Sequence, residues 1–279
     1  MDLIDPAALV LSDYGYRRIC DLVRDRFGIQ LSSQRQVLVV NRLGREVQAL
    51  GFNSYESYAD YVEADPSGRA AEMLAGLIST NHTYFFREPA HFDYLRQVVL
   101  PRLAGLGETD LRFWCAAAST GEEAYSIVMT MMEYFGPHYR GFDAGVLATD
   151  LSVRALRKAQ VGHYDADQLQ AILPDLRARY FTAGPEGKFA VAPKLRAEVL
   201  FRKFNLVADS YAFKRGFHVI FCRNVMIYFD AATRRQLAAD LYEVTAPGGY
   251  LFIGHCETLG TDSGGFCAVA PAVYQRPVA

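Results

Sequence analysis

The sequence predicts an α/β fold: a doubly wound, mostly parallel sheet with a small antiparallel β insertion, preceded by a small all-α helical domain. Two observations predict this class. From residue 111 onward, short apolar runs alternate with glycine turns and helical segments, which is the order of a parallel sheet with crossover helices. Before residue 78 the apolar residues recur at helical spacing, with almost no strand pattern.

The composition is that of a folded protein with one large domain or two unequal ones. Of 279 residues, 51% are hydrophobic and 22% charged, and the net charge is −2, so nothing indicates a nucleic-acid partner. No apolar run approaches the ~20 residues of a membrane helix, and the start does not resemble a signal peptide. Five scattered cysteines without a CxxC pair indicate reduced thiols and no zinc framework. We therefore expect a cytoplasmic monomer with no metal and no direct membrane insertion.

Four helices are predicted in the first 78 residues. Ser12 can cap a first helix, which Gly28 ends. Ser32 can cap a second helix, which Gly51 stops. This second helix is predicted to bury Val37, Val40, Leu43 and Val47. Residues 55–62 and 69–78 give the third and fourth helices.

The rest of the chain predicts the sheet. We expect strands at 111–115, 145–149, 219–222, 250–254 and 268–275, and helices at 122–135, 152–162 and 231–245. The alternation breaks between residues 166 and 204, where two strand-like runs, 178–182 and 188–192, flank a glycine-proline turn. We place the antiparallel insertion at about 170–204.

The turn at residues 116–121 is the first candidate for ligand binding. In a doubly wound sheet the first strand-to-helix turn binds the ligand, because small residues allow the backbone to approach it. Glu122 and Glu123 follow this turn. They would repel a phosphate but suit a ligand with cationic groups, of which S-adenosylmethionine is one. Acids in a first helical turn are also common partners of the helix dipole, which is the alternative interpretation.

Polar residues also follow two other predicted strands. Asp150 ends the second strand, about 20–30 residues after the glycine turn, where an acid accepts ribose hydroxyls in this architecture. Its alternative role is to cap the next helix through Ser152. The strand at 219–222 ends in Arg223 and Asn224 and leads to Tyr228. Such a strand end is where these sheets place ligand chemistry, although a core strand with a polar cap is the alternative.

Four segments in this order resemble the chemoreceptor glutamate methyltransferases of the CheR family: STNHTYFFRE (79–88), AAASTGEEAYS (116–126), ATD (148–150) and FCRNVMIYFD (221–230). PGGYLFIGHCE (247–257) adds a fifth. The resemblance covers nearly the whole chain. It implies a receptor-recognising helical domain over residues 1–78 and a Rossmann-like, S-adenosylmethionine-dependent methyltransferase domain over residues 79–279.

The resemblance also implies roles for individual residues. The implied cofactor-binding positions are Asn81, Thr83, Arg87, Gly121, Glu123, Asp150, Asn205, Leu206, Arg223 and Asn224. Arg87 and Tyr228 are implied to orient the substrate carboxylate and are the predicted catalytic residues. Arg35, Arg42 and Arg45, on the second helix, are implied to meet acidic coiled-coil helices of a receptor. A solvated basic face is the alternative for these three arginines.

The implied activity is that of a protein-glutamate O-methyltransferase acting on methyl-accepting chemotaxis proteins for sensory adaptation, with S-adenosylhomocysteine as product. A glutamate side chain with a pKa of ~4.3 is already ionised at neutral pH, so in-line methyl transfer to it needs orientation, not a base. The alternatives are a catalytically weak, cofactor-binding signalling protein and a methyltransferase for another substrate. Family members that dock a receptor's carboxyl-terminal pentapeptide carry a longer loop than AGPEGK (183–188), which predicts methylation without that tether.

Overall fold

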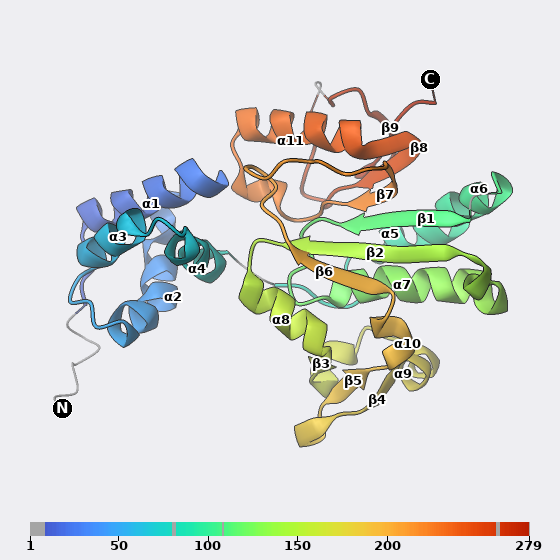
Figure 1. Cartoon of the computed structure of the whole chain (residues 1–279), viewed down its shortest axis with the longest axis horizontal. Helices are drawn as coiled ribbons and strands as arrows, with labels where there is room; N and C mark the ends of the chain where they lie inside the picture. Colours follow the sequence, from blue (N-terminus) through green and yellow to red (C-terminus); the bar gives the residue numbers. More distant parts are fainter. Residues whose placement is uncertain (1–8, 80–81, 108, 261–262, 279) are drawn as a thin grey trace. The chain divides into compact units, whose positions relative to one another are not determined.

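The structure is a computed structural model that describes residues 9–79, 82–107, 109–260 and 263–278. The chain divides into two compact units (Figure 1). The first unit combines Met1–Thr80 with two short later segments, Asn205–Ala208 and Tyr228–Thr233. The second unit holds Asn81–Phe204, Asp209–Ile227 and Arg234–Ala279.

Helices form the first unit. They are α1 (Asp13–Phe27), α2 (Gln36–Ala49), α3 (Tyr55–Ala64) and α4 (Arg69–Ile78), with a 3₁₀ turn, η2 (Ser33–Arg35), before α2. The helix α1 packs against α3 and α4, and α2 packs against α4. This arrangement confirms the predicted all-α part of the fold.

Capping signals in the sequence set where α1 begins and ends. The Ser12 hydroxyl accepts a hydrogen bond from the Gly15 N–H at 2.9 Å, which satisfies one of the amides that a helix start leaves unpaired. Gly28 closes the helix in the left-handed region, with φ of 67°, and its N–H donates to the Arg24 carbonyl at 2.8 Å. Both predicted ends of the helix are confirmed.

The predicted buried face of α2 is partly wrong. Leu43 and Val47 are buried, but Val37 is 70% exposed and Val39 is fully buried. Val37 lies six residues before Leu43, which turns it by about 120° away from Leu43 on a helix of 3.6 residues per turn. Val39 lies four residues before Leu43 and therefore shares its face.

A seven-stranded sheet forms the centre of the second unit, in the order β6-β2-β1-β7-β8-β10-β9. The strands are β1 (Asp110–Cys115), β2 (Asp143–Asp150), β6 (Val199–Lys203), β7 (Phe217–Phe221), β8 (Thr245–Phe252), β9 (Cys267–Ala270) and β10 (Val273–Gln275). The first five strands in this order are parallel, β10 is antiparallel to β8, and β9 is antiparallel to β10. Three consecutive residues of β1, Phe113, Trp114 and Cys115, are buried, as in a sheet covered on both faces. The predicted doubly wound, mostly parallel sheet is confirmed.

Helices connect these strands. α5 (Pro89–Tyr94), the π-helical segment η3 (Leu95–Val99) and α6 (Leu100–Gly105) precede β1. α7 (Glu122–Phe135) and the 3₁₀ segment η4 (Gly136–Gly141) lead to β2, α8 (Val153–Val161) follows β2, and η7 (Met226–Tyr228) and α11 (Ala231–Val244) lie between β7 and β8. Both α7 and α8 pack against β2 and β6. No helix in the described part of the chain is long and apolar enough to cross a membrane.

A separate antiparallel sheet, ordered β3-β5-β4, forms the predicted insertion. Its strands are β3 (His163–Tyr164), β4 (Phe181–Ala183) and β5 (Phe189–Val191), and it carries α9 (Pro174–Tyr180), α10 (Pro193–Arg196) and the short 3₁₀ turns η5 (Ala166–Leu169) and η6 (Pro185–Gly187). The first strand-like run, 178–182, is helical as far as Tyr180. The strand β6 lies within the range that we assigned to the insertion, but it pairs with β2 in the main sheet.

The last predicted strand, 268–275, is wrong as a single element. It is a hairpin of two antiparallel strands, β9 and β10. The chain reverses between them at Ala272, whose φ is 57°. A left-handed conformation at alanine is uncommon. A turn of this kind is usually predicted from a glycine, and no glycine stands at this position, so the sequence did not indicate the turn.

Candidate functional site

The carboxyl ends of β1 and β7 meet where the winding of the sheet reverses. The two strands are neighbours, with Cys115 paired to Phe221. From β1 the chain moves outward to β2 and β6, and then returns to β7 and continues on the other side to β8. Open α/β sheets bind ligands at such a switch point. The turn after β1 and the pair Arg223-Asn224 after β7 therefore flank one candidate site.

The turn between β1 and α7 is fixed by backbone hydrogen bonds and by a required glycine. The Ala116 N–H donates to a carbonyl of β7 at 2.8 Å, and the Ala118 N–H donates to the Thr149 carbonyl at 2.8 Å. Gly121 has a φ of 98°, which residues with a side chain rarely adopt. A Cβ on Gly121 would also lie 2.8 Å from the Cβ of Ala159 in α8.

The carboxylate of Asp150 ties this turn to the end of β2. Its Oδ2 accepts the Ser119 N–H and its Oδ1 accepts the Ser152 N–H, both at 2.8 Å. Burial raises the pKa of the Asp150 carboxyl, and the N–H groups of Ser152 and Ser119 oppose that shift. Ser152 itself caps α8. Asp150 therefore supports the start of α8 through Ser152, which is the alternative role considered for it. Each carboxylate oxygen has a further lone pair, so Asp150 can also accept a ribose hydroxyl.

The two acids at the start of α7 have different surroundings. Glu122 accepts hydrogen bonds from the Thr120 hydroxyl at 2.6 Å and from the Gln168 amide at 3.2 Å. Burial raises the pKa of Glu122. Glu123 accepts a hydrogen bond from Nη1 of Arg223 at 2.9 Å, and burial raises its pKa against the lowering effect of that guanidinium. Glu122 therefore holds the turn, whereas Glu123 belongs to the switch point.

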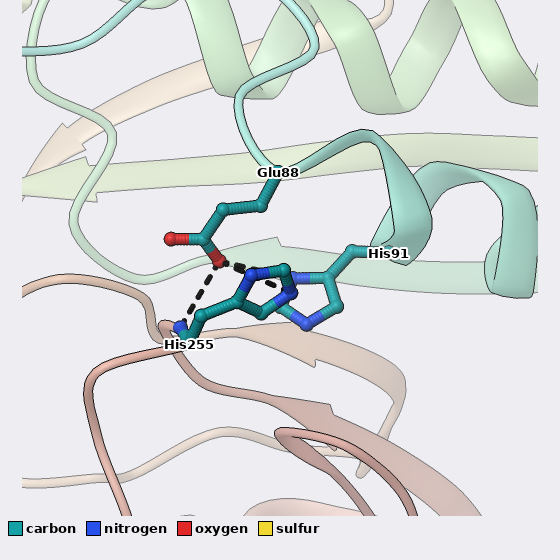
Figure 2. Close-up of side chains that lie close together, drawn as sticks. All are labelled: Glu88, His91 and His255. Carbon is teal, nitrogen blue, oxygen red and sulfur yellow. Dashed lines mark hydrogen bonds and ion pairs between the residues drawn. The ribbon is translucent and has the colours of Figure 1, made fainter.

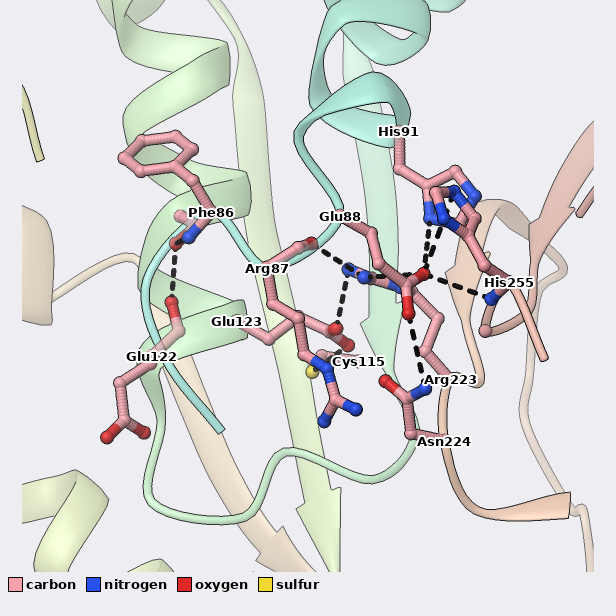
Figure 3. A network of polar contacts seen from close by, with 12 residues as sticks. Phe86, Arg87, Glu88, His91, Cys115, Glu122, Glu123, Arg223, Asn224 and His255 are labelled. Atoms are coloured by element: carbon pink, nitrogen blue, oxygen red, sulfur yellow. Dashed lines mark hydrogen bonds and ion pairs between the residues drawn. The ribbon is translucent and has the colours of Figure 1, made fainter. Parts of the chain in front are cut away.

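Arg223 is the centre of the polar network at the switch point (Figure 3). Its side chain is fully buried, and its guanidinium contacts Glu123 at 2.9 Å, Glu88 at 3.0 Å and the Arg87 carbonyl at 2.6 Å. A buried arginine is tolerated when acids pair with it in this way. Within the described residues, its Nε has no hydrogen-bond partner. Arg223 therefore fixes the segment before α5 against α7 through the two ends of its guanidinium.

Backbone strain is concentrated around this site. Of the six non-glycine residues with positive φ among the described ones, four lie on segments flanking the switch point: Phe86, Glu88, Ser119 and Asn224. Each such residue costs about 1–3 kcal/mol and persists only where its surroundings enforce it. The Ser126 hydroxyl accepts the Phe86 N–H at 3.0 Å and thereby enforces one of them. Strain of this kind clusters at functional sites.

The segment before α5 carries three of the predicted cofactor residues. Asn81 lies outside the described residues, and Thr83 is half-buried. The guanidinium of Arg87 donates to the His82 carbonyl at 2.8 Å and lies 5.9 Å from the centre of the Tyr84 ring. In contrast to Arg223, Arg87 is partly exposed.

Asn205 and Leu206 belong to the helical unit. The Asn205 amide donates to the Arg26 carbonyl at 3.2 Å, and its carbonyl oxygen accepts the Val207 N–H at 3.0 Å. Leu206 is buried. These contacts attach the segment to the end of α1, and the predicted cofactor contact of both residues stays a prediction.

Tyr228 also belongs to the helical unit. Its backbone carbonyl accepts the Gln30 N–H at 2.8 Å, and its ring lies 5.5 Å from the guanidinium of Arg35. Arg87 belongs to the sheet unit. The predicted catalytic pair of Arg87 and Tyr228 is therefore not brought together within one unit and stays a prediction.

The three arginines predicted to recognise a receptor differ in their surroundings. Arg42 donates to the carbonyls of Ile78 and Ser79 at 2.8 and 2.7 Å, so it closes the carboxyl end of α4. Arg35 is half-buried against an aromatic ring, and Arg45 is exposed. Of the three, Arg45 is the one in the exposed class.

Two family models match this chain. The one described as "CheR methyltransferase, SAM binding domain" matches residues 81–273, and "CheR methyltransferase, all-alpha domain" matches residues 15–77. The chain belongs to the CheR methyltransferase family. The predicted family and S-adenosylmethionine (SAM) as the cofactor are thereby confirmed.

Curated relatives of this CheR family member are named as chemotaxis methyltransferases. The "Chemotaxis protein methyltransferase" of Borreliella burgdorferi is 36% identical over 263 residues, which cover 93% of each chain. "Chemotaxis protein methyltransferase 1" of Pseudomonas aeruginosa is 39% identical over 83% of this chain and 85% of its own. The Salmonella typhimurium protein is 37% identical over 89% of this chain and 85% of its own.

The residues at the switch point of this CheR family member fit SAM. The molecule carries an ammonium, a sulfonium, a carboxylate and ribose hydroxyls. Glu123 and Asp150 offer carboxylates to its cationic and hydroxyl groups. The buried Nε of Arg223, which has no partner among the described residues, and the partly exposed guanidinium of Arg87 offer donors to its carboxylate. Both signs of charge that the cofactor requires are therefore present.

Glu257 is a residue of this site to which the sequence assigned no role. Its carboxylate accepts the N–H groups of Asn224 at 2.8 Å, Gly254 at 2.6 Å and Ile227 at 3.2 Å. A Cβ on Gly254 would lie 2.4 Å from the Asn224 amide nitrogen. Glu257 thus holds the loop after β7 against the end of β8. The segment PGGYLFIGHCE contained it, but a bond between residues 33 positions apart is not visible in a motif.

Proposed function

We propose that this chain transfers the methyl group of SAM to glutamate side chains of chemoreceptors, giving glutamyl 5-O-methyl esters for sensory adaptation. One observation carries the proposal. In a member of the CheR methyltransferase family, the switch point combines two carboxylates, Glu123 and Asp150, with a partly exposed arginine, Arg87. The names of the curated relatives, chemotaxis protein methyltransferases, support a protein of chemotaxis as the substrate.

A glutamate substrate requires little activation at such a site. Its pKa is ~4.3, so the carboxylate is ionised at neutral pH and no general base is needed. When bound, SAM supplies a methyl group activated on a sulfonium. The residues of this chain then have to orient the carboxylate and exclude water, and orientation alone can contribute ~7–11 kcal/mol to lowering a barrier.

Arg87 is the residue that we assign to the incoming carboxylate. A guanidinium has five N–H donors in a planar fork. One end of the Arg87 fork donates to the His82 carbonyl, and the ring of Tyr84 lies beside it, which limits its orientations. We assign a second, single hydrogen bond to the Tyr228 hydroxyl. Too strong a grip would stabilise the ground state, so directional contacts suit this task.

The cofactor residues divide by chemistry in this proposal. Glu123 receives the ammonium group, Asp150 the ribose hydroxyls, and the turn ending at Gly121 approaches the cofactor with its backbone. The other residues that we assign to the cofactor are Asn81, Thr83, Arg87, Asn205, Leu206, Arg223 and Asn224.

Receptor recognition is assigned to the basic side of α2. Arg45 is exposed and Arg35 is half-buried, so both can approach an acidic coiled coil. Arg42 contributes indirectly, because its guanidinium holds the end of α4. Exposed charges of this kind steer association more than they add affinity.

Methylation without a pentapeptide tether is also part of the proposal. Family members that dock the pentapeptide have a longer loop at the connection between β4 and β5. In this chain that connection is a short turn with internal hydrogen bonds. The Gly184 N–H donates to the Lys188 carbonyl at 2.8 Å, and the Lys188 N–H donates to the Pro185 carbonyl at 3.0 Å. We expect equal methylation of a receptor with and without its last five residues.

The test is incubation with radiolabelled SAM and purified receptor cytoplasmic fragments. We expect label on the receptor that base releases, as an ester requires. Arg87→Ala should lower the rate by about 100-fold, the scale of losing one charged donor at a reacting group. Arg96→Ala, which removes an exposed arginine on η3, is the matched control and should retain the rate. SAM binding without base-labile label on any receptor would favour the catalytically weak signalling protein instead.

A further inference from the structure

Glu88, His91 and His255 form a cluster that the proposed methyl transfer does not use (Figure 2). Their ligand atoms all lie within 4.8 Å of one another. Oε2 of Glu88 lies 3.5 Å from Nδ1 of His91 and 3.9 Å from Nε2 of His255. Glu88 and His91 lie at the start of α5, and His255 follows β8. The cluster thus joins two segments of the sheet unit that are far apart in the sequence.

His91 is the unusual member of this cluster. It is 1% exposed, and within the described part of the chain neither ring nitrogen makes a hydrogen bond of regular geometry, although a backbone group of Pro271 lies close to the ring. Buried polar atoms are nearly always hydrogen-bonded, and an exception calls for a cause such as an ion. Burial lowers the pKa of His91 to about 4, with a smaller contribution from Arg223. A ring nitrogen without a regular partner, 3.5 Å from a carboxylate oxygen, is a position where a metal could supply the missing contact.

We propose that Glu88, His91 and His255 bind a divalent transition metal of the zinc class. Two imidazoles and one carboxylate, with solvent in the fourth position, are a donor set that zinc accepts. Ligand atoms at about 2.1 Å from a tetrahedral zinc lie about 3.4 Å from one another. The His91–Glu88 distance of 3.5 Å already meets this value. The His255 side chain is 43% exposed, so it can turn to close the remaining distance.

Arg223 sets the limit on the affinity of this site. Its Nη2 lies 3.0 Å from the same Glu88 oxygen, so the metal and the guanidinium share one carboxylate. The same oxygen also accepts the His255 N–H at 3.2 Å, and the other Glu88 oxygen accepts the Asn224 amide at 3.3 Å, so a metal at Oε2 has to displace or lengthen one of these contacts. Glu123 pairs with the other end of Arg223 and offsets part of its charge. The metal would tie α5 to the loop after β8, and Glu88 would connect it to the polar network of the switch point.

The test is zinc binding by the full chain without a polyhistidine tag. After removal of metals with a chelator, we expect one equivalent of Zn²⁺ per chain in competition with a chromophoric chelator, and Co²⁺ absorption bands typical of low coordination. Mg²⁺ should bind far more weakly, because it prefers oxygen ligands. Zn²⁺ should also raise the midpoint of thermal unfolding, since it binds the folded state.

Two variants separate this site from unspecific binding. His255→Ala removes a direct ligand, so it should weaken Zn²⁺ binding by more than the about 10–100-fold that loss of an outer-shell partner costs, and it should lose the thermal shift while unfolding like the parent in chelator. His138→Ala removes an exposed histidine of η4 outside the cluster and should bind Zn²⁺ like the parent. Absence of stoichiometric Zn²⁺ in the parent, or equal affinity in His255→Ala, would overturn the proposal. The outcome does not depend on methylation, so it is independent of the proposed function.

Discussion

Asp150 shows how one carboxylate can serve both the fold and a ligand. It accepts two backbone N–H groups, one from the turn after β1 and one from the start of α8. Hydrogen bonds to a charged group contribute about 1.5–3 kcal/mol each, less than the about 5–15 kcal/mol by which native proteins are stable. Asp150 also stands at the end of β2, where this architecture places an acid that accepts ribose hydroxyls.

Asp150→Ala should therefore weaken SAM binding while leaving the fold intact. The ribose hydroxyls lose their acceptor, and the turn that carries Ser119 loses its anchor. Titration calorimetry measures the affinity, and circular dichroism checks the fold. Asp175→Ala removes an exposed acid at the start of α9 and should leave the affinity unchanged. An unchanged affinity in Asp150→Ala would remove this residue from the site.

Glu122 makes stability depend on pH in a direction that its burial fixes. Its folded-state pKa is raised above the unfolded value, so the folded state holds the proton more tightly. The cost of ionising Glu122 therefore appears as pH rises above ~4.3, the unfolded value, and is complete above the folded pKa. Glu122→Gln should gain free energy of unfolding relative to the parent as pH rises from 4 to 8.

Urea unfolding at a series of pH values measures this difference. Glu243→Gln changes an exposed glutamate in α11 and serves as the control. A constant difference between Glu122→Gln and the parent would show that the carboxyl titrates alike in the folded and unfolded states.

The sequence predicted single positions of the site better than the contacts between them. Asp150 and Glu123 follow strand ends, and the rule that ligands bind there is independent of side-chain packing. The ion pair between Arg223 and Glu88 was not predictable, because Glu88 lies in a segment that precedes the sheet. No local pattern encodes a pairing across such a distance.

At the scale of elements, the bounds of helices that follow a glycine were predicted most accurately. The helix α7 has the predicted bounds, Glu122–Phe135, and α4 has the predicted bounds, Arg69–Ile78. The segment β6 was missed, because it follows the insertion and, among the described residues, pairs with β2 alone. Residues 89–105 were missed as helix, although Pro89 lies at a first-turn position that suits it. The end of a helix is determined by adjacent residues, whereas the formation of an edge strand depends on a partner strand that is distant in the sequence.

The turn between β1 and α7 should be intolerant of any side chain at Gly121. Its φ of 98° is strained for alanine, and a Cβ would lie 2.8 Å from Ala159. We expect Gly121→Ala to cost about 1–3 kcal/mol from the backbone alone, with a further loss from the displaced α8. Gly105→Ala is the matched control, since that glycine ends α6 with open space around it.

Urea unfolding of both variants decides the point. Gly105→Ala should be neutral or stabilising by about 0.4–1 kcal/mol, because it restricts the unfolded chain. SAM affinity should fall in Gly121→Ala only. Equal stability of the two variants would mean that the turn relaxes at no cost and that its conformation is not enforced.

At the scale of the whole molecule, the two compact units are interleaved in sequence. The helical unit is completed by two short segments, Asn205–Ala208 and Tyr228–Thr233, from the later part of the chain. Gly28, at the end of α1, is packed closely: a Cβ added there would lie 3.1 Å from the Val207 side chain and 3.4 Å from the Phe229 ring. The end of α1 thus packs against residues that follow it by about two hundred positions, as the bond between Gln30 and Asp230 also shows.

This interleaving predicts where Phe229→Ala will loosen the chain. Phe229 is buried against the end of α1, and removing a buried phenylalanine ring costs about 3–5 kcal/mol. Amide hydrogen exchange should rise mainly in α1, while α7, in the sheet unit, should keep most of its protection, because local openings follow packing units. Ile227→Ala truncates an exposed side chain nearby and should change the free energy of unfolding by no more than about 0.5 kcal/mol. An equal rise of exchange in α1 and α7 would show that the two units open as one, and unchanged exchange in α1 would show that Phe229 does not complete the helical unit.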